Sequence, residues 1–337
     1  MDSINIKQLA ETLGLSTSTI SRAFRGNKEI SEATKERILA KAKELNYQPN
    51  HYASNLREQK SKTIAVIVPE LANNYFSQAI HGIERVAREN GYHILIYVTN
   101  DEYEKEVNFI SHLHNGRAEG IIMSVSGEAN DHNYLNSLGA NRLPLVFFDR
   151  VYEDIEAARV LTDDYESSFM ATEHLIEQGC EKIAYLVVNK NLSIGKTRMQ
   201  GYKDALEKHS LKFNEELVID CSNNYEENRL ILIDVLTRLK PEGVFASVER
   251  LAFATYYACY ELDIKIPEQL KVISFSSLEI APLLNPSLTS ITQPAAEIGE
   301  TAANLLFEML DGEVKNLKPK QVVLKSKIVL RKSTSST

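Results

Sequence analysis

The sequence lacks the long apolar segment of a membrane protein: no run approaches the roughly 18 consecutive apolar residues that a spanning helix needs. Its first residues also lack the basic-then-apolar order of a secretory signal. Only three cysteines occur, Cys180, Cys221 and Cys259, and they are widely spaced without a C-x-x-C pair. We therefore expect a cytoplasmic protein with no membrane contact, whose cysteines are small core or surface residues.

Common enzyme signatures are missing as well. The chain contains no H-E-x-x-H, no G-x-S-x-G and no G-x-G-x-x-G, and its eight histidines form no cluster at metal-ligand spacing. The segment "IGKT" at 194–197 resembles the end of a phosphate-binding loop, but Lys190 stands where that loop needs its first glycine. We expect no enzymatic activity, no cofactor and no bound metal.

Charge is distributed unevenly along the 337 residues. Residues 1–62 carry eleven Lys or Arg against seven Asp or Glu, whereas the remainder carries 27 against 39. An acidic body repels phosphates, so a contact with a polyanion would be confined to the basic first segment. Charge alone leaves a second interpretation open, in which this segment is simply a solvated basic face.

Residues 1–48, the head, read as three short helices. Asn5 with Gln8 is a helix-start signature, and Gly14 ends the first apolar stripe. Ser16 and Ser31 are expected to cap the second and third helices. The expected core positions are Ile6, Leu9, Ala10 and Leu13 in the first helix, Ile20, Ala23 and Phe24 in the second, and Ile38, Leu39, Ala42 and Leu45 in the third.

The first two helices are separated by a very short turn, which is typical of a helix-turn-helix. In that geometry the exposed start of the second helix enters the DNA major groove. The stretch "LSTSTISRAFRG" at 15–26 is unusually rich in hydroxyls, which can donate to and accept from base edges and phosphates at short range. Arg22 and Arg25 would add contacts to phosphates or guanines. An exposed capping turn without a partner is the alternative.

Residues 49–61 follow Pro49 and contain few apolar side chains, but they lack the Gly and Pro of an ordinary linker. Asn50 could cap a short hinge helix in this segment. Leu56 would then be exposed, where it could wedge between base pairs from the minor groove. The alternative, a leucine that packs on the next domain, remains open at this point.

From Thr63 onward the pattern alternates apolar β-branched runs with amphipathic helices. Continuous apolar runs between helices are typical of parallel strands covered on both faces. Two such series predict two doubly wound lobes with a ligand cleft between them. The expected strands lie at 64–68, 94–98, 120–125 and 145–149 in the first series, and at 183–188, 243–247 and 272–275 in the second.

These segments together resemble the lactose-repressor/galactose-repressor (LacI/GalR) family of bacterial transcription regulators, over nearly the whole chain. The resemblance implies an α/β fold, with an all-α helix-turn-helix head and a two-lobed, periplasmic-binding-protein-like core of doubly wound parallel sheets. The segments that carry it are "IKQLAETLGLSTSTISRAFRG", "ISEATKERILAKAKELNYQPNHYASNLR", "TIAVIVPELANNYFSQAIHGIE", "ATEHLIEQGCEKIAY", "RMQGYKDAL", "VFAS", "IPEQLKVISF" and "LTSITQPAAEIGETAANLL".

Domain boundaries follow from this resemblance. We expect the head at 1–48, the hinge at 49–61 and a disordered tail at 332–337. The lobe nearer the head would combine residues 62–161 with 293–320, and the other lobe would combine residues 162–292 with 321–331.

The resemblance also implies a homodimer whose paired heads bind a near-palindromic operator in double-stranded DNA. Thr17, Ser18 and Arg22 would read major-groove bases, and Leu56 with its copy in the second subunit would wedge into the minor groove. The residues expected near phosphates are Ser16, Thr19, Ser21 and Asn27. A ligand that shifts the lobes would change operator affinity through its different affinity for the two arrangements.

The expected effector site departs from the family pattern. Relatives that bind free sugars usually carry Asn-Asp soon after "VFA" and Asp after the "GF" strand, where this chain has Val248-Glu249 and Ser276. Arg198 could hold a hydroxyl or a carboxylate, and its planar fork favours an anion, which indicates a sugar acid or another unusual effector. The candidate effector residues are Tyr75, Phe76, Ser124, Asp149, Arg198, Val248, Ser276 and Gln293. Tyr75 and Phe76 could instead be core aromatics, and Asp149 a loop cap.

The sequence thus predicts a DNA-binding transcriptional regulator, in the form of a repressor of carbohydrate uptake or catabolism genes with an effector between its lobes. One alternative is a regulator controlled by a partner protein. The other is a solute-binding receptor with the same two-lobed body, against which the head and the missing signal argue.

Overall fold

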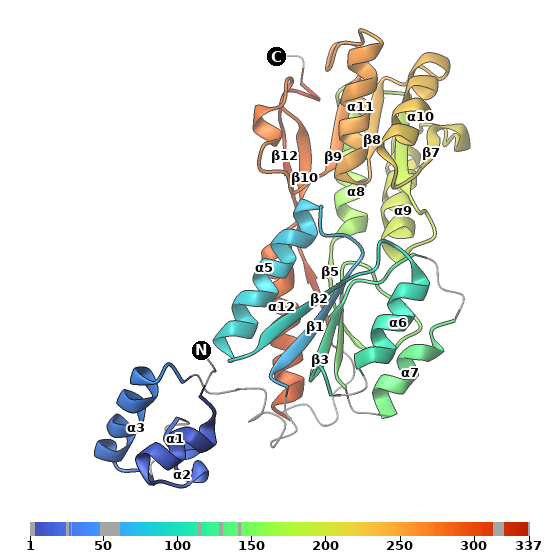
Figure 1. The fold of residues 1–337 in the computed structure, drawn as a ribbon. Coiled ribbons are helices and arrows are strands. Elements are labelled where there is room, and N and C mark those ends of the chain that lie inside the picture. Colours follow the sequence, from blue (N-terminus) through green and yellow to red (C-terminus); the bar gives the residue numbers. More distant parts are fainter. Residues whose placement is uncertain are drawn as a thin grey trace. The chain divides into compact units, whose positions relative to one another are not determined.

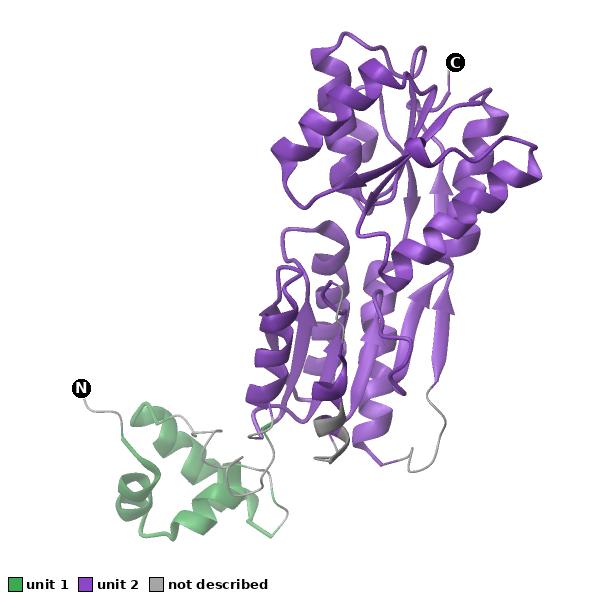
Figure 2. Ribbon diagram, turned by 90° about the vertical axis from the view of Figure 1, so that its right-hand side faces the viewer, with its two compact units in different colours: residues 1–61 green, residues 62–337 purple. Residues whose placement is uncertain are grey.

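The fold is described from a computed structural model, which covers residues 4–24, 27, 29–47, 61–113, 116–127, 131–140, 143–312 and 320–335, without the side chains at 136, 137, 139 and 140. The chain divides into two compact units, residues 1–61 and residues 62–337 (Figure 2).

In its described residues the first unit has three helices, α1 (Ile6–Leu13), α2 (Thr17–Phe24) and α3 (Glu32–Glu44). The predicted start signals are confirmed: Asn5 and Gln8 form a capping box, and the Ser31 hydroxyl accepts the Thr34 N–H. Gly14 ends α1 with a positive φ of 64°, a conformation that glycine adopts without strain.

Seven side chains from the three described helices form the buried centre of this unit: Leu9, Ala10, Leu13, Ile20, Ala23, Ile38 and Ala42. The prediction that Leu39 belongs to this core is wrong, because its side chain is 42% exposed. A helix turns by about 100° per residue, so the position after Ile38 points away from the face that Ile38 and Ala42 share.

The second unit contains two six-stranded sheets, and each sheet with its helices forms a lobe. In the first lobe the strand order is β11-β5-β4-β3-β1-β2, with every pair parallel. Its strands are β1 (Thr63–Val68), β2 (His93–Val98), β3 (Gly120–Met123), β4 (Leu145–Phe148), β5 (Ala158–Thr162) and β11 (Gln321–Leu324). Its helices are α5 (Asn74–Glu89), α6 (Tyr103–Leu113), α7 (Asn133–Ala140) and α12 (Ala295–Leu310).

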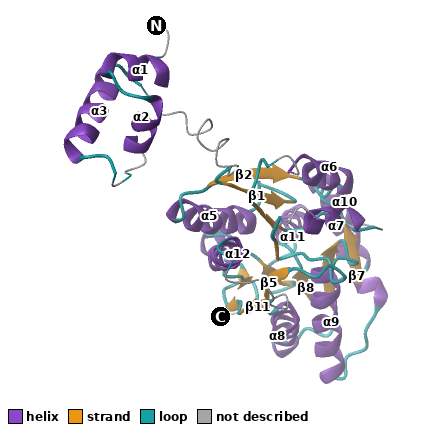
Figure 3. Cartoon of the chain, turned by 90° about the horizontal axis from the view of Figure 1, so that it is seen from below, coloured by secondary structure: helices purple, strands orange, loops and turns teal. Residues whose placement is uncertain are grey.

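Helices cover both faces of this first sheet, as the continuous apolar runs predict. α5 and α12 pack side by side on one face, and α6 and α7 lie on the other (Figures 1 and 3). Alternate strand residues supply the two cores: Ile64 and Val66 face α5 and α12, whereas Ala65 and Ile67 face α6 and α7.

The second lobe repeats this plan with the strand order β12-β10-β9-β8-β6-β7. All described pairs are parallel except β10 with β12, which are antiparallel. Its strands are β6 (Ile183–Val188), β7 (Val218–Cys221), β8 (Gly243–Ala246), β9 (Lys271–Phe275), β10 (Thr289–Thr292) and β12 (Lys327–Val329). α8 (Asp164–Glu177) and α9 (Ser193–Lys208) cover one face, and α10 (Tyr225–Arg238) and α11 (Glu249–Glu261) cover the other.

The chain crosses between the lobes three times: from β5 to α8, from β10 to α12 and from β11 to β12. Hydrogen bonds join these crossings. The Gln293 side-chain amide donates to Thr162 Oγ1 at 2.9 Å, and the Ser326 N–H donates to Asp163 Oδ1 at 2.8 Å. The three segments therefore form one connected hinge.

Two expected boundaries differ from the structure. Residues 321–324 form β11 in the first lobe, not the second, because their apolar run pairs with the open edge of β5. The expected disordered tail is ordered at Ser333 and Thr334, which are fully buried: the Ser333 hydroxyl donates to the Val272 carbonyl oxygen, and the Thr334 hydroxyl bonds that of Thr289. Short hydroxyl side chains, typical of tails, here satisfy buried backbone groups.

Candidate functional site

The start of α2 presents polar side chains to solvent. Ser16, Thr17, Ser18 and Arg22 are exposed, and Thr19 and Ser21 are half-buried. The Ser16 hydroxyl accepts the Thr19 N–H at 3.1 Å, which caps the helix as predicted. Ile20 and Ala23 are buried on the opposite side of the helix. The predicted reading positions Thr17, Ser18 and Arg22 therefore occupy the free face of a helix whose other face is fixed in the core.

Arg22 and Asn27 both contact the turn after α2. The Arg22 guanidinium lies 3.2 Å from the Glu29 carboxylate, and both side chains are mostly exposed. The Asn27 side-chain oxygen accepts the Glu29 N–H at 2.9 Å. An exposed pair of this kind is weak and exchanges easily for another partner, so Arg22 is free to contact nucleic acid. Arg25, Asn50 and Leu56 lie outside the described residues.

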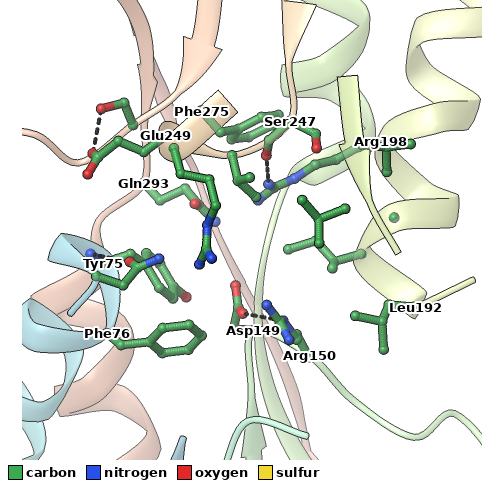
Figure 4. Close-up of a pocket in the computed structure, with 18 of the residues that line it drawn as sticks. Tyr75, Phe76, Asp149, Arg150, Leu192, Arg198, Ser247, Glu249, Phe275 and Gln293 are labelled. Carbon is green, nitrogen blue, oxygen red and sulfur yellow. Dashed lines mark hydrogen bonds and ion pairs between the residues drawn. The ribbon is translucent and has the colours of Figure 1, made fainter. Parts of the chain in front are cut away.

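The second unit has a cavity between its lobes, with a free volume of about 80 Å³ (Figure 4). At roughly 10–15 Å³ for each water, this is space for several waters, the scale of a small-molecule site. Seven of the eight candidate effector residues line it: Tyr75, Phe76, Asp149, Arg198, Val248, Ser276 and Gln293. Ser124 does not. It is fully buried behind the site, and its hydroxyl donates to Asp149 Oδ2 at 3.4 Å.

The cavity lies where parallel strands end. Asp149 directly follows β4, Ser247 follows β8, Ser276 follows β9 and Gln293 follows β10. The carboxyl ends of parallel strands are the usual ligand-binding edge of a doubly wound sheet, since the chain there turns into loops of free sequence. Two such edges face each other in this unit, which accounts for the convergence of residues from distant parts of the chain.

Arg198 is held inside the second lobe rather than offered to the cavity as a free cation. It is only 4% exposed, its Nε lies 2.7 Å from Asp164 Oδ1, and its Nη1 donates to the Ser247 carbonyl oxygen at 2.6 Å. The guanidinium also stacks on the Phe275 ring, 3.5 Å from its centroid. Its charge is therefore neutralised within the protein, which removes the main reason for expecting an acidic effector.

Asp149 and Tyr75 are polar residues whose buried side chains line the cavity. Burial raises the pKa of the Asp149 carboxyl to about 6, against the opposing influence of Arg150 and Arg198. Burial also raises the pKa of Tyr75 well above its usual range, and the Asp149 charge adds to this effect. Among the described residues the Tyr75 hydroxyl has no hydrogen-bond partner. A buried hydroxyl without a partner is costly, so this site is suited to a ligand that supplies one.

Glu249 and Ser276, which stand where free-sugar-binding relatives usually have acidic residues, bond each other. The Ser276 hydroxyl donates to Glu249 Oε2 at 2.6 Å, and the Asn74 side-chain amide donates to Glu249 Oε1 at 2.7 Å. Asn74 belongs to the first lobe and Glu249 to the second. Val248 is half-buried and packs against the core of the second lobe.

The cavity and the groups paired to it carry an excess of negative charge. Its three arginines each pair with a carboxylate: Arg150 with Asp101, Arg198 with Asp164 and Arg250 with Glu70. Asp149 and Glu249 are additional carboxylates in the lining. An anionic ligand would meet this excess at short range and low dielectric, where like charges repel strongly.

Sequence reasoning missed several lining residues, among them Asn73, Arg150, Asn223, Glu249 and Arg250. Position relative to the strands could have found some of them. Arg150 comes two residues after β4, and Glu249 and Arg250 begin the helix that follows β8. Asn223 follows β7, a short strand that the apolar pattern does not reveal.

Within the described ranges, no helix has the length and apolar character to cross a membrane. In the same residues, no group of three or more His, Cys, Asp or Glu side chains is placed to hold a metal ion.

Comparisons with known proteins agree with this architecture. Residues 5–50 match the family described as bacterial regulatory proteins, lacI family, and residues 172–334 match the periplasmic binding protein-like domain. The chain is 30% identical over 308 residues to the HTH-type transcriptional repressor PurR of Vibrio atlanticus, covering 90% of this chain and 91% of that protein. It is 27% identical over 332 residues to the ribose operon repressor of Haemophilus influenzae, covering 98% of both.

One of the similar solved structures contains a bound ligand. The LacI family transcriptional regulator from Enterococcus faecium, with bound ribose, is 25% identical and matches with a TM-score of 0.72 over 82% of this chain and 99% of that one. With its three-helix head, its two doubly wound lobes and a relative of 30% identity over nine-tenths of its length, the chain belongs to the lacI family of bacterial regulatory proteins, which act on transcription.

Proposed function

We propose that this chain is a repressor of genes for carbohydrate uptake or catabolism, whose affinity for a near-palindromic operator is controlled by an uncharged sugar between its lobes. The relatives named above include a repressor of a ribose operon and a regulator with bound ribose. The observation that carries the ligand class is the cavity itself, with its unpartnered Tyr75 hydroxyl and its paired arginines.

In this proposal the exposed face of α2 reads the operator. Thr17, Ser18 and Arg22 contact base edges in the major groove, because they share the face opposite the buried Ile20 and Ala23. The hydroxyls and amide around them would lie near phosphates: Ser16, Thr19, Ser21 and Asn27. Asn50 and Leu56, predicted to act in the hinge, belong to the same proposal.

Selection of bound sequences from a random duplex pool tests this assignment. We expect a motif with two-fold symmetry, because two heads of one dimer would bind two half-sites. The affinity of the protein for this motif should fall steeply as the salt concentration rises. Recovery of no enriched sequence would contradict the proposal and favour the solute-binding alternative. Recovery of an asymmetric motif would contradict binding to a near-palindromic operator.

The uncharged character of the effector follows from the balance of charge. The three arginines of the lining are each already paired with a carboxylate, and the lining carries Asp149 and Glu249 besides. Adding a ligand carboxylate or phosphate there costs electrostatic energy, whereas sugar hydroxyls can donate to Asp149 and bond Tyr75. Phe76 adds an apolar side chain to the lining of the site.

Titration calorimetry of the full chain with pentoses and hexoses, and with the matching sugar acids and phosphates, tests the effector class. We expect heat from at least one neutral sugar and none from the anions, and Tyr75→Phe should weaken that binding. Tyr225→Phe, on the exposed surface of α10, is the matched control. Binding of the anions alone would overturn the neutral-sugar proposal, and binding of none would favour control by a partner protein.

The homodimer is proposed from exposed apolar surface. β2 is an edge strand with Leu95 and Ile96 exposed, and Ile280 and Leu283 protrude from the second lobe. A groove lined by α5, Ala296 and residues 278–280 joins the two lobes and includes Ile280. Leu283→Arg should therefore shift the protein toward monomer in sedimentation, whereas Leu230→Arg, on exposed α10, should not.

A further inference from the structure

One rim of the cleft is closed by a chain of polar side chains that passes from lobe to lobe. Arg250, the second residue of α11, donates to the Glu70 carboxylate of the first lobe, and its Nη1 lies 3.2 Å from Asn223 Oδ1. Asn223 in turn donates to Asp101 Oδ2 of the first lobe at 2.9 Å. Asp101 accepts a further bond from Arg150. We refer to Glu70, Asp101, Asn223 and Arg250 as the rim latch.

The rim latch is joined to the walls of the cavity at both ends. Glu70 accepts a long hydrogen bond of 3.5 Å from the Asn73 side chain, and Asn73 caps the helix that carries Tyr75. On the other side, Arg250 adjoins Glu249, which bonds Ser276 and, across the cleft, Asn74. Both lobes therefore contribute groups to one continuous network at the edge of the effector site.

Burial gives these contacts an intermediate strength. The side chains of Arg250 and Glu70 are 27% and 30% exposed. At this intermediate exposure, salt and solvent screen the attraction between the two charges less than they screen a surface ion pair. Water can still solvate each charge when the lobes separate. Such a pair can stabilise the closed arrangement of the lobes and still allow them to open.

We propose that the rim latch sets the equilibrium between closed and open lobes, with Arg250 and Glu70 as its positioning residues. The protein's own side chains then supply part of the closure free energy, and a ligand that binds the closed lobes gains apparent affinity in proportion to the closed fraction. This inference rests on the proposed control by lobe movement, but the lobe equilibrium can be measured without sugar or operator.

Hydrogen–deuterium exchange of the full-length protein tests the latch. Arg250→Gln should speed exchange at the rim of the opposite lobe, in the segment around Glu70 and Tyr75, by roughly two- to fivefold. Glu70→Gln should do the same around residues 247–252. The double variant should be no faster than Arg250→Gln alone, because both substitutions remove the same contact between Arg250 and Glu70. Raising the salt concentration should accelerate exchange in the unaltered chain and not in the variants.

The matched control is Arg229→Gln, which removes bonds to Glu226 and Glu261 within the second lobe only. It should leave the cleft segments unchanged. The reversed pair, Glu70→Arg with Arg250→Glu, should restore protection if the two residues act through their mutual contact. Faster exchange confined to the substituted lobe, additive single effects or no rescue by reversal would overturn the latch.

These outcomes are separable from those of the proposed function. If the protein binds a neutral sugar and a symmetric operator, but the substitutions do not change hydrogen–deuterium exchange at the cleft, only the latch proposal is rejected. A protein whose lobes respond as described, but which binds no sugar, retains the latch and rejects the effector class.

Discussion

Arg198 and Asp164 form a buried ion pair, 2.7 Å apart, that joins α9 to the start of α8. The side chains are only 5% and 8% exposed. Both charges are removed from water, so their attraction mainly offsets the cost of desolvating them. Removing one partner, in contrast, leaves the other charge buried and uncompensated.

Removing one member of this pair should be far more damaging than removing both. Asp164→Asn should lower the free energy of unfolding by about 3–5 kcal/mol, because it leaves the Arg198 charge buried without a partner. The apolar double variant Arg198→Met with Asp164→Leu should recover much of this loss. Urea unfolding of the unaltered protein, the single variant and the double variant measures these losses. A double variant that loses as much stability as the single variant, or more, would contradict this account.

Asp149 should make stability depend on pH between about 4 and 6. Its pKa rises from 3.8 to about 6 in the folded protein, so the folded state holds a proton that the unfolded state has released. Stability contributed by this group is therefore present below about pH 4 and is lost as the pH rises through about 6. Asp149→Asn should abolish that slope and raise stability at pH 7 by about 1–3 kcal/mol.

Chemical unfolding at pH 4.5, 5.5 and 7 measures the dependence on Asp149. Asp234→Asn, on exposed α10 beside Arg238, is the control and should leave the slope as it is. A profile for Asp149→Asn that parallels the unaltered chain would assign the slope to another group.

Gly82 and Gly299 let α5 and α12 approach each other closely. A Cβ on Gly299 would lie 2.0 Å from the Ala79 carbonyl oxygen, and one on Gly82 would lie 2.1 Å from that of Ala296. The obstructing atoms are backbone and cannot rotate away, so either alanine substitution should destabilise the second unit by about 3 kcal/mol or more. Thermal unfolding should show this loss, whereas Arg88→Ala on the exposed side of α5 should change little.

Arg22→Ala should weaken binding to the selected operator by roughly 1–3 kcal/mol if its guanidinium reads a guanine. Lys43→Ala, which removes the same charge from exposed α3, is the matched control and should act weakly on any sequence. Gel retardation on the operator and on a scrambled duplex separates the two roles. Equal weakening by Arg22→Ala on both duplexes would assign Arg22 to a phosphate.

The parts of the fold that sequence could predict are those with a strong local signal. β1 and β6 carry continuous apolar runs, and the caps at Asn5, Ser16 and Ser31 act within their own helix turn. β7, β10 and β12 are strands of three or four residues with polar members, and only pairing with a neighbour makes them strands.

The candidate site shows the same division. Its residues could be predicted one by one from the segments that resemble the family, but their contacts with each other could not. Arg198 looks free in sequence because Asp164 lies 34 positions earlier, and only the packing of α8 against α9 brings them together. The contacts of Glu249 and Arg250 across the cleft likewise depend on how the lobes meet.

The interleaving of the lobes constrains how the molecule is made. The first lobe receives its covering helix α12 and its edge strand β11 from residues 295–324, after the whole second lobe except β12 has been translated. On the ribosome, α5 alone can cover the face of the first sheet that it shares with α12 until α12 is made, so the part over β3, β4 and β5 stays exposed. A chain truncated before residue 295 leaves this apolar surface open to aggregation. Release of a nearly complete chain is thus the event that lets both lobes finish folding together.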